Sequence, residues 1–258
     1  MIRLLLTKFK NILLLLIIGA MVLSSTGTSY ANDYFTWSVE SNTQIETMAT
    51  APQRQCEVIV RAGEYQGKAG KRIYVNNTTV KLPDDIPVRN DGDGKGFYVS
   101  EWDINVKEAK AQEKLQAWGI KAKLQVAYSK SEDLNAAGRI ANKSNPYLYV
   151  SVHHNYYESN STGYFSMYNP KNEASKKTAI RLSNAIQDNG QVPKRDNRPN
   201  TGYIGEMNVI NPSTIPVLLE LGFFSNIDEL EEICSDSYVN YVSTNLANEI
   251  AKIVNENK

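Results

Sequence analysis

The stretch YLYVSVHHN, residues 147–155, indicates the class of fold. Its first six residues form an almost continuous apolar run, which is typical of a strand buried on both faces in a parallel sheet. The run ends in His153 and His154, the only two histidines of the chain. Functional side chains of parallel sheets gather at the carboxyl ends of the strands. The end of this strand is therefore the first place to look for a site.

Other segments carry strand or helix patterns on either side of this run. The predicted strands are 57–60, 121–128, 147–152, 163–168 and 217–223, and the predicted helices are 100–119, 173–188 and 238–256. Strands that alternate with helices predict an α/β fold, which here means a single domain with a mostly parallel twisted sheet flanked by helices.

Residues 71–99 contain two turn signals, LPDDIP and DGDGKG. DGDGKG is similar to part of a calcium-binding loop, but the later glutamate ligand is absent at the required spacing. We therefore expect a long irregular loop with no calcium role. The helix that follows is predicted to begin with a capping box formed by Ser100 and Asp103.

The first 31 residues have the layout of a secretory signal. A basic start (MIRLLLTKFK) precedes an apolar middle (NILLLLIIGAMVL) and a small-residue exit (TSYA). The apolar run is short for a membrane span, so export with cleavage is favoured over an uncleaved N-terminal anchor. Residues 32–55 are polar without a sustained period and are predicted to be a linker or arm. This leaves residues 56–258 as one globular domain.

Charge and cysteine content limit the partners of the mature chain. Cleavage after residue 31 removes three of the 28 basic residues and none of the 28 acidic ones, so the net charge becomes −3. No basic run remains, which argues against a nucleic-acid partner, and no membrane contact is expected after cleavage. Cys56 and Cys234 could form one disulfide or remain buried thiols, and the sequence does not decide between these states.

An acidic residue interrupts the last predicted strand. Glu220 lies within the apolar run 217–223, where an ionised carboxylate needs a metal, a cation or a raised pKa. The alternative is a glutamate at an exposed edge, paired with Arg or Lys. Charged residues are rarely buried without a function, so the sequence favours a functional role for Glu220.

Three motifs resemble those of the zinc-dependent N-acetylmuramoyl-L-alanine amidases, the peptidoglycan-cleaving hydrolases sometimes called type-3 amidases. GRIANKSNPYLYVSVHHN (138–155) is similar to the family's R-x-x-x-A-N…S-I-H-x-N stretch. PVLLELGFFSNIDE (216–229) resembles P-x-L-x-E-x-G-F-x-S-N-x-x-E, and SEWDINVKEAKAQEKLQAWGIKAKL (100–124) resembles an E-x-x-x-N helix that leads into a strand. The motifs occur in the family's order and cover most of residues 56–258.

The resemblance implies an exported peptidoglycan hydrolase that cleaves the amide bond between N-acetylmuramic acid and L-alanine. By position, it implies that Glu101 and His153 are metal ligands and that Glu220 is the catalytic residue. In similar enzymes the metal holds a water molecule and polarises the amide carbonyl, while the glutamate removes and returns the proton. Peptidoglycan is the implied partner, and a secreted or cell-wall-associated location is implied. The sequence identifies neither the substrate-binding residues nor an activator.

One motif departs from the family pattern. The family's first motif reads roughly D-P-G-H-G-G, and its histidine is the remaining zinc ligand. The aligned stretch here is RAGEYQGKAG, which puts Glu64 in the place of that histidine. The resemblance then implies a ligand set of Glu64, Glu101 and His153. Two carboxylates favour harder ions such as manganese over zinc, although glutamate also binds zinc and leaves a position open for water.

Neighbouring polar residues have weaker assignments. His154 is predicted to be a lining or structural residue, because adjacent residues of an extended strand point to opposite faces. Arg139 and Asn142 match family positions for which packing and salt-bridge roles are expected. Asn155 either orients the site loop or is a turn residue at the strand end.

Two other functions compete with a metal-dependent amidase. A catalytically silent relative could bind peptidoglycan or a cell-wall enzyme, and Glu64 supports this alternative, whereas Glu220 within its full motif supports an active enzyme. A metal-free hydrolase that uses Glu101 and Glu220 on glycosidic bonds has a chemical basis, but the family resemblance argues against it.

Overall fold

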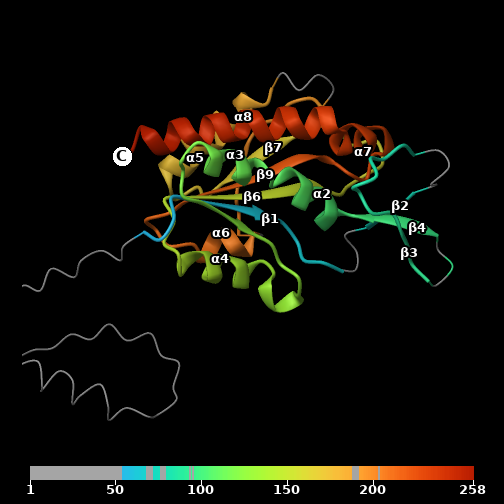
Figure 1. Cartoon of the computed structure of the whole chain (residues 1–258), viewed down its shortest axis with the longest axis horizontal. Helices are drawn as coiled ribbons and strands as arrows, with labels where there is room; N and C mark the ends of the chain where they lie inside the picture. The colour runs from blue at the N-terminus through green and yellow to red at the C-terminus, as the bar shows by residue number, and fades with distance from the viewer. Residues whose placement is uncertain are drawn as a thin grey trace, which may run out of the picture. The chain divides into compact units, whose positions relative to one another are not determined.

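The computed structural model describes residues 54–67, 72–75, 80–92, 94, 96–187, 192–202 and 204–258 (Figure 1). The predicted signal (1–31) and nearly all of the predicted arm (32–55) lie outside these residues. Within the described part of the chain, every helix is too short or too polar to cross a membrane.

A six-stranded sheet forms the centre of the domain, with the strand order β5-β1-β6-β9-β7-β8. Its strands are β1 (Val58–Ala62), β5 (Ala122–Gln125), β6 (Leu148–Asn155), β7 (Phe165–Tyr168), β8 (Arg198–Pro199) and β9 (Ile215–Phe223). All neighbouring strands are parallel except β7 and β9, which are antiparallel. The predicted α/β fold with a mostly parallel sheet is confirmed.

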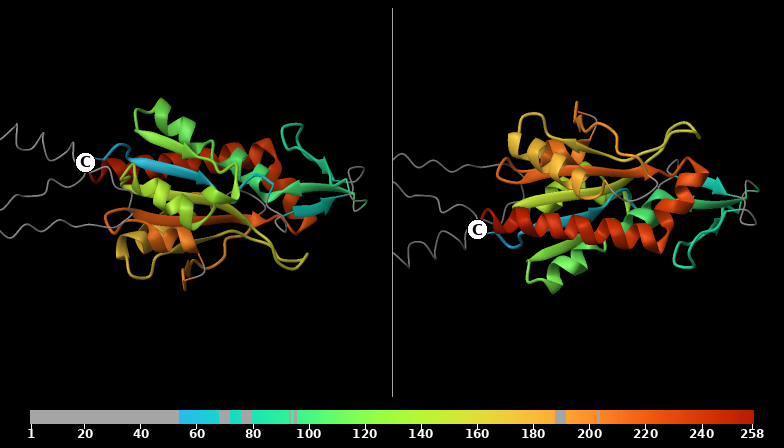
Figure 2. Two further views of the ribbon diagram at one scale, coloured as in Figure 1. Left: turned by 90° about the horizontal axis from the view of Figure 1, so that it is seen from below. Right: turned by 90° about the horizontal axis from the view of Figure 1, so that it is seen from above.

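Helices cover both faces of this sheet. One face carries α2 (Glu101–Glu108), α3 (Ala111–Ala117), α5 (Glu173–Ala185) and α8 (Asp236–Asn255), and the other carries α4 (Asn135–Asn142) and α6 (Gly205–Val209) (Figures 1 and 2). The described residues also form a 3-10 turn at Lys130–Glu132 and the helix α7 (Ile227–Cys234). The larger apolar core lies under α8, where its stripe Val242, Leu246 and Ile250 meets the valines and leucines of β1, β6 and β9.

The segment expected to be an irregular loop contains a second sheet. Its strands are β2 (Arg72–Val75), β3 (Arg89–Asn90) and β4 (Phe97–Ser100), and they pair antiparallel in the order β2-β4-β3. The strands span only two to four residues, too few for a periodic signal in the sequence. Because β4 runs directly into α2, this small sheet fixes the start of the helix that begins with Glu101.

The predicted helix 100–119 is divided into α2 and α3. At the junction the Lys110 N–H donates to the carbonyl of Lys107, three residues back, instead of continuing the α-helical pattern. Ser100 is the N-cap of α2, but its side chain makes no capping hydrogen bond, so the predicted capping box is wrong.

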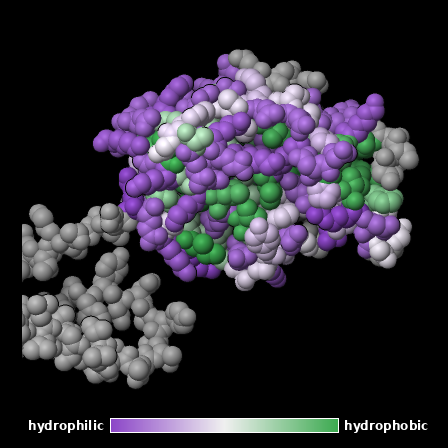
Figure 3. Space-filling view, viewed as in Figure 1, coloured by the Kyte–Doolittle hydropathy of each residue, from purple (hydrophilic) through white to green (hydrophobic). Residues whose placement is uncertain are grey.

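The outer edge of the main sheet keeps apolar surface. Leu124 of the edge strand β5 and Ile140 of α4 are both exposed. In the view of Figure 3 the surface is mainly hydrophilic, with apolar patches near the middle and at the right-hand side.

Candidate metal centre

Two glutamate side chains and one histidine side chain converge where β6 ends. One ligand atom each from Glu64, Glu101 and His153 lies within 4.8 Å of the others. His153 Nδ1 is 3.2 Å from Glu101 Oε1 and 4.0 Å from Glu64 Oε1. All three side chains are buried. The structure thus brings together the three residues that the sequence proposed as ligands.

The distances are compatible with a shared cation. Ligand atoms about 2.0–2.2 Å from a tetrahedral zinc ion are roughly 3.4 Å from one another. The separations from His153 Nδ1 to the two glutamates, 3.2 and 4.0 Å, lie close to that value. Two carboxylates and one imidazole are a donor set for zinc, manganese or a similar divalent ion. These residues therefore fit a divalent metal.

The loop after β1 is shaped by close contact with His153. A side chain at position 63 would place its Cβ 2.5 Å from His153 Nδ1, so only glycine fits there. Glu64 follows with φ of 63°, a left-handed conformation that non-glycine residues adopt rarely. The Asn105 side chain donates to the Gly63 carbonyl at 3.1 Å and to Glu101 Oε1 at 3.2 Å. Asn105 thereby ties the Glu64 loop to helix α2.

The opposite ring nitrogen of His153 faces a second group of polar residues. His153 Nε2 lies 3.4 Å from Glu206 Oε1 and 3.1 Å from Ser151 Oγ. Glu206 in turn pairs with Arg61 at 2.9 Å and accepts from the Tyr149 hydroxyl at 3.1 Å. Glu206 and Arg61 are fully buried. His153 is therefore held between a carboxylate at each ring nitrogen.

Glu206 and Arg61 were not found from the sequence. Arg61 had a signal, because a basic residue directly after the apolar run 58–60 needs a buried anion if the strand continues inward. Glu206 had none, since it lies in a five-residue helix without a strong pattern.

The ion pairs set the charges of this network. Burial disfavours the charge on His153, but the hydrogen bonds and charges of Glu101 and Glu206 outweigh it and raise the His153 pKa to about 10. Burial disfavours the charge on Glu206 too, but Arg61 and His153 lower the Glu206 pKa to about 2. Without a metal, the site therefore holds an imidazolium between carboxylates.

The His154 ring contacts Asn105 of α2. It is fully buried, and its Nδ1 lies 2.8 Å from the Asn105 side-chain oxygen. Burial lowers the His154 pKa to about 3, so the ring is neutral. Its structural contact is with Asn105, which also holds Glu101.

Glu220 lies beside this centre on the neighbouring strand. In the β6–β9 register Glu220 pairs with His153, and in the β7–β9 register it pairs with Phe165. Paired residues of adjacent strands point to the same face of a sheet. Glu220 is partly exposed, unlike the rest of its strand. The residue proposed as catalytic therefore lies next to the proposed ligand His153.

Comparison with protein families identifies the fold and the enzyme class. A family model described as N-acetylmuramoyl-L-alanine amidase matches residues 89–252. The chain belongs to this family. Membership makes this amidase a hydrolase of cell-wall peptidoglycan. The matched stretch contains Glu101, His153 and Glu220, and Glu64 lies outside it. A search of curated proteins gave no match.

Solved amidase structures share the fold. A Clostridium difficile 630 amidase is 18% identical with a TM-score of 0.57, covering 80% of this chain and 100% of that one. AmiC2 of Nostoc punctiforme is 19% identical with a TM-score of 0.55, covering 78% and 98%. CwlD of Clostridioides difficile, solved in complex with the GerS lipoprotein, is 20% identical with a TM-score of 0.58, covering 78% and 99%.

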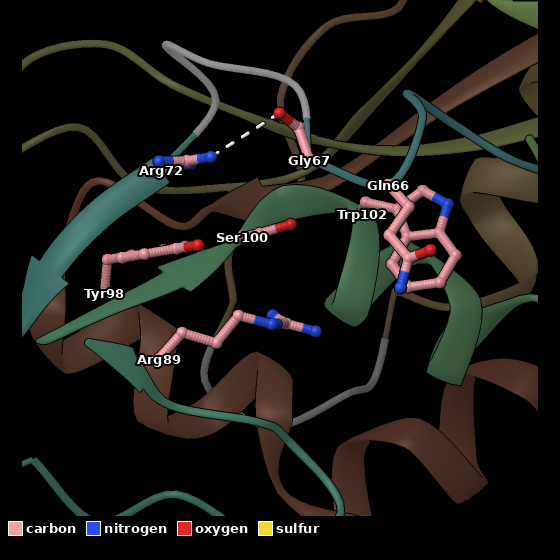
Figure 4. A pocket seen from close by; sticks show the side chains of 7 residues that line it. All are labelled: Gln66, Gly67, Arg72, Arg89, Tyr98, Ser100 and Trp102. Atoms are coloured by element: carbon pink, nitrogen blue, oxygen red, sulfur yellow. Dashed lines mark hydrogen bonds between the residues drawn. The ribbon is translucent and has the colours of Figure 1, made fainter. Parts of the chain in front are cut away.

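A small cavity of about 80 Å³ adjoins the centre of this amidase on the side of the small sheet. Ser100 and Trp102, the neighbours of Glu101 in sequence, line it. In Figure 4 the side chains of Ser100, Arg72 and Arg89 point toward the same space. Arg89 makes a two-fold ion pair with Asp103, one arm at 2.9 Å. Its charge is thereby balanced within the protein.

Proposed function

We propose that this amidase is an exported enzyme that cleaves the amide bond between N-acetylmuramic acid and L-alanine. In this proposal Glu64, Glu101 and His153 hold a divalent ion, and Glu220 is the general base. The observation that supports it most directly is the convergence of three buried ligand atoms beside Glu220. The signal-like sequence at residues 1–31 supports export to the cell wall.

The bound ion would supply a Lewis acid for the scissile carbonyl and lower the pKa of a water molecule. Glu220 would take a proton from the attacking water and return it to the leaving nitrogen. Glu206 would accept a hydrogen bond from His153 Nε2–H, which leaves Nδ1 directed at Glu64 and Glu101. Asn105 would keep the Glu101 side chain and the Glu64 loop in register.

Zinc is the proposed ion by family likeness, and manganese is the alternative favoured by the ligand set. Glu64 in place of histidine adds a negative charge to the centre, which reduces the positive field acting on a bound water. Carboxylate oxygens also suit harder ions better than imidazole does.

A catalytically silent wall-binding module is the second candidate. It is favoured by the ion pairs of His153, which as an imidazolium already pairs with Glu101 and Glu206. Those two contacts hold His153 in place without a metal, and Glu64, 4.0 Å away, adds a further negative charge.

The deciding experiment uses purified residues 32–258 dialysed against zinc or manganese. We expect about one ion per chain and release of peptide from peptidoglycan. Glu220→Gln should lower the rate at least about 100-fold and leave metal content unchanged, because its role is proton transfer. Glu113→Gln, an exposed carboxylate on α3, is the matched control. Absence of stoichiometric metal and of peptide release would establish the silent module instead.

A further inference from the structure

A groove of about 320 Å³ opens at the carboxyl ends of β6 and β9. It is lined by Asn155, Tyr157, Ser161, Arg195, Arg198 and Phe223. Asn155 and Phe223 are the last residues of their strands. None of these side chains belongs to the metal cluster.

The two arginines place the groove on the Glu220 side of the centre. The Arg198 guanidinium lies over the ring of Phe165 at 4.5 Å, and Phe165 is the register partner of Glu220 on β7. The Arg195 guanidinium lies over the ring of Phe223 at 5.1 Å, three residues beyond Glu220 on the same chain. Both phenylalanines are buried, so the guanidinium groups rest on a fixed apolar floor.

The backbone holds the arginine segment tightly against β7. The Arg195 N–H donates to the Tyr164 carbonyl at 2.8 Å, and the Tyr164 N–H donates to the Pro193 carbonyl at 2.9 Å. Gly163 has φ of 103°, and a Cβ there would lie 2.6 Å from the Pro193 carbonyl oxygen. Only glycine permits this approach, so Gly163 and these backbone hydrogen bonds fix the position of the Arg195 backbone.

The groove is cationic. Arg195 and Arg198 are exposed, and among the described residues neither forms an ion pair with a carboxylate. The charge of Arg195 acts on buried Glu229, whose carboxylate accepts the N–H groups of Gly163 and Phe223, at 2.9 and 2.6 Å. Two stacked guanidinium groups without a carboxylate of the described residues at ion-pair distance match the planar, bidentate geometry of a carboxylate ligand.

The position of the groove beside Glu220 indicates which part of the substrate it would bind. A proton that Glu220 returns to the leaving nitrogen goes to the peptide half, so the peptide must lie on the Glu220 side. The cavity between Arg72 and Arg89 is less suitable, because it is about 80 Å³ and Asp103 already balances Arg89.

We propose that this groove binds a carboxylate of the stem peptide and that Arg195 and Arg198 select anionic peptides. The inference rests on the proposed function, since it assumes that Glu220 faces the leaving group. It adds two specificity-determining residues and a substrate class, N-acetylmuramoyl peptides with a free carboxylate next to L-alanine.

The test measures binding with turnover suppressed by Glu220→Gln in the zinc-dialysed protein. The two probes are N-acetylmuramoyl-L-alanyl-D-glutamate and the same molecule with both carboxyl groups converted to carboxamides. The acid should bind about ten-fold more tightly than the diamide, as expected for charge-assisted hydrogen bonds. Adding Arg195→Met or Arg198→Met should remove most of this preference and leave diamide binding unchanged.

Two further variants separate charge recognition from a folding defect. Arg198→Lys, which keeps the charge, should retain part of the preference, and Lys177→Met on α5 should retain all of it. Equal binding of acid and diamide by the Glu220→Gln protein would overturn the groove. So would an equal loss of both ligands in the arginine variants.

The outcome is distinguishable from failure of the proposed function. If the protein prefers the acid but the wild type does not hydrolyse it, the carboxylate-binding groove is supported and the proposed amidase activity is contradicted. If the wild type hydrolyses acid and diamide with equal kcat/KM, the amidase activity is supported and the carboxylate-binding groove is contradicted.

Discussion

Glu206 and Glu108 are both fully buried, one on each side of the main sheet, and the protein holds them in different charge states. Glu206, on the α4 and α6 side, pairs with Arg61 at 2.9 Å, and its pKa is lowered to about 2. Glu108, near α8, has no hydrogen-bond partner among the described residues for either oxygen. Burial raises its pKa to about 8, although the nearby charge of Lys107 opposes the rise.

The difference shows what burial alone does to a carboxylate. Near α8 the neighbouring cation Lys107 pairs with Asp85 and Asp236 instead of Glu108, so burial keeps Glu108 neutral at moderate pH. On the other face Arg61 offsets the cost of burial and keeps Glu206 charged, which in turn orients His153. The adjacent histidines repeat this pattern, with His153 charged between carboxylates and His154 neutral beside Asn105.

Removing Arg61 from its ion pair with Glu206 should have the largest effect on stability. Arg61→Met removes the closer of the two cations that pair with buried Glu206 and leaves only His153, so we expect the free energy of unfolding to fall by about 3 kcal/mol. Urea denaturation at pH 7 measures it. The double variant Arg61→Met/Glu206→Gln should recover much of the loss because no buried charge is stranded. A loss below about 1 kcal/mol in the single variant would show that the pair is solvated.

Removing the neutral acid should stabilise the protein at high pH. Glu108 has a folded pKa of about 8, above the ordinary value of 4.5, so the folded state binds the proton more tightly. Because of this group, the free energy of unfolding of the protein decreases as pH rises from about 4.5 to about 8. Glu108→Gln should raise Tm by about 5 °C or more at pH 8 and change it little at pH 4.5. A shift of the same size at both pH values would contradict this account; exposed Glu113→Gln is the control.

Substitutions of the two buried glutamates, Glu206 and Glu108, should separate an effect on metal binding from an effect on the fold. Glu206→Gln keeps the shape of the side chain but removes the charge that fixes His153, so we expect zinc affinity to fall about 10–100-fold. Competition with a chromogenic chelator measures the affinity. Glu108→Gln should leave it unchanged, and an equal effect of both variants would indicate a general loosening of the fold.

The smallest expected effect concerns the cysteines. Cys56 packs with Ile59 and Tyr149, Cys234 belongs to the core under α8, and both are buried free thiols. Two thiols in separate clusters cannot bridge without backbone movement. Adding a reductant should therefore change Tm by less than about 1 °C. A drop of several degrees would reveal a disulfide.

The main sheet was predictable because its strands are apolar runs. The predicted strands 147–152 and 217–223 correspond to β6 and β9, and the predicted helices 173–188 and 238–256 correspond to α5 and α8. The small sheet was missed, since strands such as β3, with two residues, carry no periodicity. The capping box failed because Ser100 has a capping position without a capping hydrogen bond.

The candidate site was predictable where motifs carried it. Glu64, Glu101 and His153 were named from motif positions, and the fold brings them together. Arg61 and Glu206 are 145 positions apart in the numbering, and their ion pair depends on a packing contact that local sequence does not encode. Arg195 and Arg198 were likewise invisible, because their orientation comes from stacking on Phe223 and Phe165.

The strand order also governs when the site can form. β9 is the last strand to be synthesised, yet it lies between β6 and β7. A growing chain that has passed β8 but not β9 therefore has its sheet in two separate halves, without the strand that carries Glu220. The proposed peptidoglycan hydrolysis therefore requires that β9 first insert between β6 and β7, so an incompletely folded chain is inactive.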